Sequence, residues 1–64
     1  MLSKTEIVEI LEEYIHVRQD REVMKIYLTD RPRSLEHLAE MCEVSVSTVK
    51  RTINRNSWIY KYLK

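Results

Sequence analysis

Side chains that donate hydrogen bonds or carry positive charge recur between residues 45 and 55 of this chain. Hydroxyls and carboxamides donate and accept hydrogen bonds, whereas lysine and arginine donate to anions, and arginine can do so through two parallel bonds. This chemistry suits the binding of phosphate oxygens and polar ring edges without any covalent step. The residues concerned are Ser45, Ser47, Thr48, Lys50, Arg51 and Asn54.

The apolar residues around this stretch have the spacing of two short helices that cross. Ala39 is small enough for two helix axes to approach closely, and Val44 follows in the turn between them. Val49 and Ile53 are four positions apart and therefore share one face of the second helix. The segment 38–54 thus has the spacing of a helix-turn-helix, whose second helix would present a polar face suited to the major groove of DNA. We therefore expect a DNA-binding module.

Two known patterns are similar to this segment. The matching residues are Ala39, Glu40, Val44, Ser45, Thr48, Val49, Arg51 and Asn54. Their spacing resembles the A-E-x-x-G-V-S-x-x-T-V-x-R-x-x-N pattern of Lac-type repressors. The run V-S-V-S-T-V at 44–49 also resembles the V-S-x-S-T-V of small stage III sporulation regulators, which likewise place helices before the motif. The resemblance covers residues 34–55, and we identify none in residues 1–30.

One position departs from both patterns. The two families usually have glycine in the turn, where a left-handed backbone is wanted, and this chain has Glu43. A residue with a side chain costs about 1–2 kcal/mol in that conformation. We therefore expect either a strained Glu43 or a turn that is looser or of another conformation.

The resemblance also implies roles for individual side chains. Val46 would contact a thymine methyl group, Ser47 would offer an adaptable hydrogen bond, and Lys50 and Arg51 would reach further along the groove. Arg51 is the expected reader of guanine O6 and N7. The alternative for these surface residues, and for Arg31 and Arg33 at the entry to the motif, is simple solvation. The expected phosphate contacts are Arg33, Ser34, Ser45, Thr48, Asn54 and Arg55.

Two helices are expected before the motif. Ser3 and Glu6 form the pattern of a capping box at the start of the first helix, which we expect to end near Arg18–Gln19. Asp20 is expected to cap the second helix, which should stop near 29–30 because Pro32 disfavours helix in the residue before it. The first helix carries a broad apolar stripe at Ile7, Val8, Ile10, Leu11, Tyr14 and Ile15.

The motif itself accounts for two more helices. Ser34 is expected to cap a third helix over 35–42, and Ser45 a fourth over 46–55. The chain has no glycine, which argues against the hairpin of a β wing. We therefore expect an all-α bundle of four to five helices in one domain over 1–64. It comprises N-terminal supporting helices in 1–30, the helix-turn-helix in 34–55 and a C-terminal segment in 57–64.

Charge is distributed unevenly along the chain, although the net charge is only +1. Residues 1–30 hold four Lys or Arg against seven Asp or Glu, and residues 31–64 hold seven against three. An acidic front and a basic back suggest that one face meets phosphate and the other does not. The alternative interpretation is that these charges are ordinary solvated surface residues.

Several other classes of protein are disfavoured. Zinc sites need about four ligands at characteristic spacing, which His16, His37 and Cys42 do not provide. We expect neither catalysis nor a metal or other cofactor. No apolar run approaches the roughly 20 residues of a membrane span, and we expect no signal peptide. A single cysteine cannot form an internal disulfide, so we expect a cytoplasmic location.

Together these features predict a small bacterial or phage transcription regulator that binds double-stranded DNA. The first helix is the expected homodimer surface, and transcription machinery is a candidate partner. The chief alternative is an adaptor that keeps the fold but binds protein through its acidic front. A weaker one is single-strand binding by the C-terminal aromatics among basic residues. We expect Trp58, Ile59 and Tyr62 instead to cover the core or to pair with a second chain, because a chain of 64 residues needs the extra apolar area.

Overall fold

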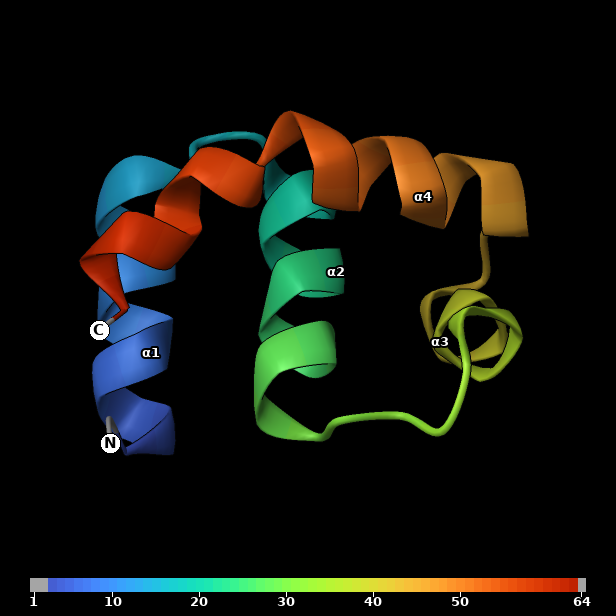
Figure 1. Ribbon diagram of the computed structural model, residues 1–64, viewed down its shortest axis with the longest axis horizontal. Helices are drawn as coiled ribbons and strands as arrows, with labels where there is room; N and C mark the ends of the chain where they lie inside the picture. Colours follow the sequence, from blue (N-terminus) through green and yellow to red (C-terminus); the bar gives the residue numbers. More distant parts are fainter. Residues whose placement is uncertain (1–2, 64) are drawn as a thin grey trace.

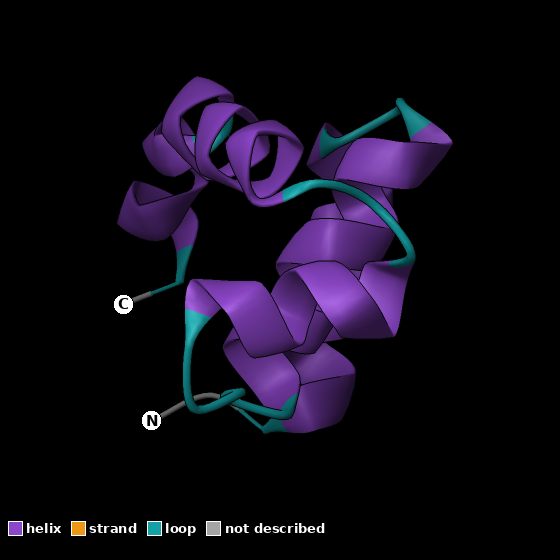
Figure 2. Cartoon of the chain, turned by 90° about the vertical axis from the view of Figure 1, so that its right-hand side faces the viewer, coloured by secondary structure: helices purple, strands orange, loops and turns teal. Residues whose placement is uncertain are grey.

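The computed structural model describes residues 3–63, which fold into helices and contain no strand. The elements are α1 (Lys4–Tyr14), α2 (Arg18–Thr29), α3 (Leu35–Cys42), α4 (Val46–Arg55) and the 3₁₀ helix η1 (Ser57–Tyr62). Figure 1 shows α1 and α2 side by side, with α4 running across one end of α2 and η1 continuing over α1. Figure 2, from the side, shows helices joined by short loops and no strand. The expected all-α architecture is confirmed.

Serine side chains begin three of the helices, as expected from the sequence. Ser3 Oγ accepts from the Glu6 amide at 3.2 Å while Glu6 Oε1 accepts from the Ser3 amide at 3.3 Å, which completes the capping box. Ser34 Oγ accepts from the His37 amide at 3.1 Å, at the start of α3. Ser45 begins α4 in the same way. These bonds satisfy amides that have no partner inside the helix.

The link between the first two helices differs from the expectation. α1 ends at Tyr14, earlier than predicted, because residues 15–17 are extended, with Ile15 at φ −111° and ψ 111°. This short link lets α2 turn back along α1 while the Ile15 side chain enters the core at 3% exposure. The prediction that Asp20 caps α2 is also wrong, because the N-cap is Val17 and Asp20 lies inside the first turn of the helix.

The core consists of two clusters on opposite sides of α2. Val23 and Met24 are neighbours in the sequence, so they point to different sides of the helix. Met24 packs with Leu11, Ile15 and Ile59, whereas Val23 packs with Leu38, Ala39 and Val49. Ile53 contacts both clusters. Both halves of the molecule, α1–η1 and α3–α4, therefore pack against α2, which lies between them.

Three aromatic rings close the α1–η1 half at the surface. Tyr14 stacks on Tyr62 with ring centroids 4.4 Å apart, and Trp58 meets both rings edge-on. Each ring remains about 40% exposed. We call Tyr14, Trp58 and Tyr62 the aromatic trio. The C-terminal segment thus folds back as expected, and η1 covers part of the apolar stripe of α1.

The turn between α3 and α4 keeps the conformation that a glycine would favour. Glu43 has φ 58° and ψ 42°, which is left-handed. The Val44 amide donates to the Ala39 carbonyl at 3.0 Å, and the Glu43 amide donates to the Glu40 carbonyl at 3.2 Å. This pair of bonds is the Schellman pattern that closes a helix C-terminus. The turn is therefore not looser, and Glu43 bears the strain.

Replacing Glu43 by glycine should relieve that strain. We expect E43G to raise the free energy of unfolding by about 0.5–1 kcal/mol, because the relief exceeds the entropy that a new glycine loses on folding. Urea unfolding followed by circular dichroism measures the change. The matched control is Glu40→Gly inside α3, which should lower stability by about 1 kcal/mol. If E43G and E40G lowered the free energy of unfolding equally, Glu43 would not be strained.

Candidate nucleic-acid interface

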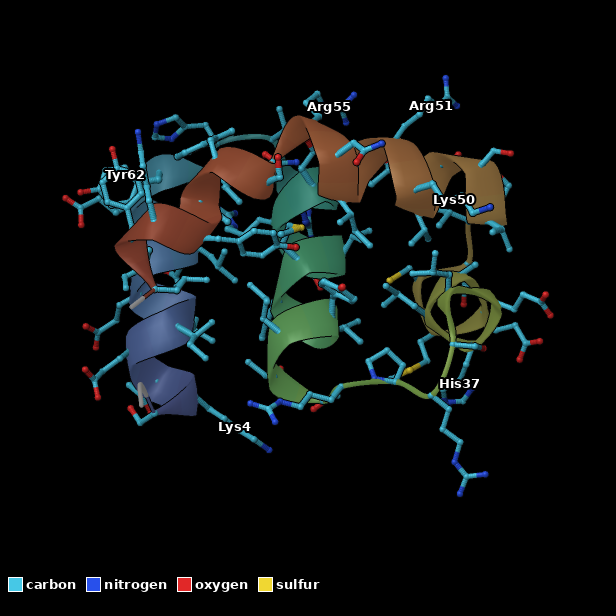
Figure 3. All side chains as sticks on the ribbon, in the orientation of Figure 1. Lys4, His37, Lys50, Arg51, Arg55 and Tyr62 are labelled. Carbon is cyan, nitrogen blue, oxygen red and sulfur yellow. The ribbon has the colours of Figure 1, made fainter. Side chains whose placement is uncertain are left out.

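The side of α4 that faces away from the core is polar and cationic. Residues 46–55 contain no acid, and the exposed positions form what we call the α4 outer face. Figure 3 shows Arg51 and Arg55 projecting from α4 on the side away from the other helices, with Lys50 on its flank. The α4 outer face comprises Ser47, Lys50, Arg51, Asn54 and Arg55.

The opposite side of α4 fixes this orientation. Val49 is fully buried, and it packs with Leu38 and with Ala39, which is 4% exposed. Ala39 has only a methyl group, so α3 and α4 can approach closely where they cross, as the spacing predicted. Thr52 is 1% exposed on the same side. Val49 and Ile53 are four positions apart and share the buried side of α4, and this sets which side chains of α4 face solvent.

The start of α4 is capped by Ser45, as the sequence predicted. Ser45 Oγ accepts from the Thr48 amide at 3.1 Å and lies 2.9 Å from Thr48 Oγ1, so the two hydroxyls bond each other. Val46 is half-buried and packs on the cluster that contains Val49. Only part of the Val46 side chain is thus free for the thymine contact expected from the sequence. Ser47 is exposed beside it.

The two central cations of the α4 outer face stand free of the chain's own acids. Lys50 and Arg51 are exposed. Within residues 3–63, the ion pair that forms joins Arg55 to Asp20 instead. The positive charge of Lys50 and Arg51 is therefore open to an external anion.

Arg55 is held by a network that the sequence analysis missed. Its Nε donates to Asp20 Oδ2 at 3.0 Å and its Nη2 to Asp20 Oδ1 at 2.7 Å. Asn56 Nδ2 donates to the same Asp20 Oδ2 at 3.0 Å and to the Thr52 carbonyl at 2.8 Å. Asp20 is 3% exposed. The network ties the last turn of α4 to the first turn of α2, so the role expected for Arg55 is shared with an internal ion pair.

This network makes stability depend on acid pH. The bonds from Arg55 hold the pKa of the Asp20 carboxyl below its ordinary value of about 3.8, against the opposing effect of burial, and Asn56 adds to the lowering. A lowered pKa stabilises the fold at pH values above about 4, and that contribution disappears as the pH falls through the pKa of the folded state. We expect D20N to be about 1–2 kcal/mol less stable than the wild type at pH 7, because it loses hydrogen bonds to a charged group that are partly exposed to solvent. Urea unfolding at pH 7 and pH 2.5 measures the difference in free energy of unfolding between the wild type and D20N. An equal difference at both pH values would contradict the role of the Asp20 charge.

The other predicted phosphate contacts lie apart from α4. Figure 1 shows the segment between α2 and α3 on the side of the molecule opposite to α4. This segment carries Arg33, which is exposed, and leads into Ser34, whose hydroxyl caps α3. The structure therefore brings Arg51, Asn54 and Arg55 together on α4, but it does not bring Arg33 to them.

Cys42 is half-buried against the second cluster, and burial raises the pKa of its thiol. Residues 3–63 place no three metal-ligating side chains together. None of the helices described is long and apolar enough to cross a membrane. Comparison of the chain with protein-family models, curated proteins and solved structures finds no match in any of the three.

Proposed function

We propose that the protein binds double-stranded DNA with α4 in the major groove. The observation that carries the proposal is the α4 outer face, where Lys50 and Arg51 stand free on a helix fixed from behind by Val49. B-DNA admits an α-helix in its major groove, and arginine reads guanine there through two bonds. In this arrangement Arg51 and Ser47 contact base edges, with Lys50 and the free part of Val46 beside them.

Phosphate contacts would fix the helix in the groove. Asn54 and Arg55 lie at the C-terminal end of the α4 outer face, and Ser45 and Thr48 lie at the start of the α4 helix. The segment that carries Arg33 and leads into Ser34 lies on the side of the molecule opposite to α4, so these two residues are not among the contacts proposed for this groove. Such contacts set position and orientation but carry no sequence information.

We further propose that the protein is a bacterial or phage transcription regulator that acts in the cytoplasm as a homodimer. One recognition helix covers only a few base pairs, so a symmetric site read by two copies would give useful specificity. The core takes up Leu11 and Ile15 of the α1 stripe. Tyr14 of the same stripe stays exposed in the aromatic trio, which we propose as the surface for a second copy, and transcription machinery is a candidate further partner.

The proposal is tested by the salt dependence of binding to a random-sequence duplex. Neutralisation of about four phosphates predicts a slope of about −3 to −4 in a plot of log affinity against log salt concentration. Fluorescence anisotropy with a labelled duplex at 50–200 mM NaCl measures this slope. No binding of the duplex at 50 mM NaCl would show that the proposal is wrong.

A protein-binding adaptor is the second candidate function. The aromatic trio is exposed beside α1, the helix that carries Glu6, Glu9, Glu12 and Glu13. An exposed apolar patch with charged residues nearby is typical of a surface that binds protein. The anisotropy experiment separates the two functions, because an adaptor would leave the duplex unbound. A single-stranded oligonucleotide of the same length tests stacking on the trio.

A further inference from the structure

Arg55 is the residue of the α4 outer face whose guanidinium is held in place by the rest of the chain. Nε and Nη2 both donate to the Asp20 carboxylate, at 3.0 and 2.7 Å. The third nitrogen, Nη1, takes part in neither bond, and the side chain remains 61% exposed. Figure 3 shows Arg55 on the same side of α4 as Arg51. One edge of the guanidinium is thus tied down while another faces solvent beside the free cations.

Asp20 is itself held firmly enough to act as an anchor. It is 3% exposed, and Asn56 Nδ2 donates to its Oδ2 at 3.0 Å. The same Asn56 nitrogen donates to the Thr52 carbonyl at 2.8 Å, which fixes the carboxamide. A freely rotating arginine loses conformational entropy when it is immobilised by a ligand. An arginine that is already immobilised by a fixed carboxylate loses less.

We propose that Asp20 is a positioning residue for DNA binding, which holds Arg55 so that its Nη1 edge donates to a phosphodiester oxygen of the backbone. The inference rests on the proposed function and adds to it a residue outside the recognition helix. Charge alone predicts the opposite effect for Asp20, because a carboxylate near the DNA-facing side repels phosphate. The two effects can therefore be told apart by whether a single substitution of Asp20 weakens or strengthens DNA binding.

The decisive variant is D20N. Asparagine has one acceptor oxygen in place of two, so the two-bond grip on Arg55 is lost while the net charge of the protein rises by one. We expect D20N to bind a random-sequence duplex about fivefold more weakly at 100 mM NaCl. We also expect the slope of log affinity against log salt to become about one unit shallower, because one phosphate contact is lost.

Variants of Arg55 test whether Asp20 acts through it. R55A should lose about the same affinity and the same unit of slope as D20N, and the double variant D20N/R55A should lose little more than R55A alone. R55K keeps the charge but cannot form both bonds, so it should resemble R55A rather than the wild type. Additive losses in the double variant would overturn the inference.

A stability control separates positioning from general loosening of the fold. Leu28→Ala removes a half-buried side chain near the other end of α2, away from the Asp20–Arg55 network. All variants are assayed at 10 °C after circular dichroism confirms that they are folded. L28A should keep the wild-type slope, and a slope that falls in L28A as it does in D20N would overturn the inference.

The failure of this inference is distinguishable from failure of the proposed function. If the wild type binds the duplex and D20N binds as tightly or more tightly, then Asp20 does not position Arg55 and the inference alone is wrong. If the wild type fails to bind the duplex at 50 mM NaCl, both are wrong. The inference and the proposed function are both supported if D20N binds the duplex more weakly with a shallower salt slope, and if the double variant D20N/R55A loses little more affinity than R55A alone.

Discussion

Replacing Arg51 with alanine is expected to weaken binding to a selected duplex site by about 1–3 kcal/mol, or about 5- to 150-fold. Arg51 is exposed and, within residues 3–63, forms no ion pair. It lies near the middle of the α4 outer face, where the proposed complex would bring its side chain to the base edges. The site is obtained by selection from a random duplex pool, and anisotropy titration then compares the two proteins.

The fold should be unchanged in R51A, because an exposed side chain of this kind contributes little to stability. The matched control is Lys25→Ala, which removes the same charge from an exposed position on α2 beside Val8 and Glu12. K25A should bind the selected site within about twofold of the wild type. Equal losses of affinity in R51A and K25A would mean that binding responds to net charge rather than to a specific contact between Arg51 and a base.

Replacing Leu38 with alanine should have the largest effect on stability. Leu38 is fully buried between α2 and α4, in the cluster with Val23 and Val49. Truncation of a buried leucine to alanine costs about 2–5 kcal/mol, whereas a domain of this size has about 3–10 kcal/mol of total stability. We therefore expect L38A to be largely unfolded near 37 °C, as measured by thermal circular dichroism, and to lose DNA binding at that temperature.

The control for L38A is Met41→Ala on the same helix. Met41 is 41% exposed, so its truncation should change stability by less than about 0.5 kcal/mol. A stable L38A protein would show that α3 does not pack as described. If L38A still bound DNA after α3 had unfolded, the proposal that α3 holds α4 in place for binding would be wrong.

Local signals in the sequence correctly predicted three of the helix starts, whereas the start of α2 was predicted wrongly. Ser3, Ser34 and Ser45 all cap helices, because an N-cap depends on a hydroxyl and on an amide three residues away. The spacing of Ala39, Val49 and Ile53 likewise predicted the crossing of α3 and α4. Such signals act within one or two turns of helix, and the tertiary structure does not override them here.

What the sequence did not predict depends on residues distant in the chain. Asp20 has the residue type of an N-cap, and only the arrival of Arg55 and Asn56, 35 and 36 positions later, explains its burial. The early end of α1 has a similar origin, because Ile15 leaves the helix to join Met24 and Ile59. Periodicity cannot reveal either contact.

The expected site was predicted in part. The exposed positions of α4 follow from its own periodicity, so Ser47, Lys50 and Arg51 face solvent as expected. Val46 was expected at the surface, but it lies at the edge of the apolar face and packs on the core. The internal partner of Arg55 had no signal in the sequence.

The position of α2 between the two clusters has a consequence for communication within the molecule. Val23 and Met24 are adjacent on α2, and Ile53 packs against both clusters, so loss of either half removes contacts from the helix that the other half packs on. We therefore expect the two halves to unfold as one unit. A partner bound to the aromatic trio would then stabilise α4 by mass action on the unfolding equilibrium, with no displacement of α4.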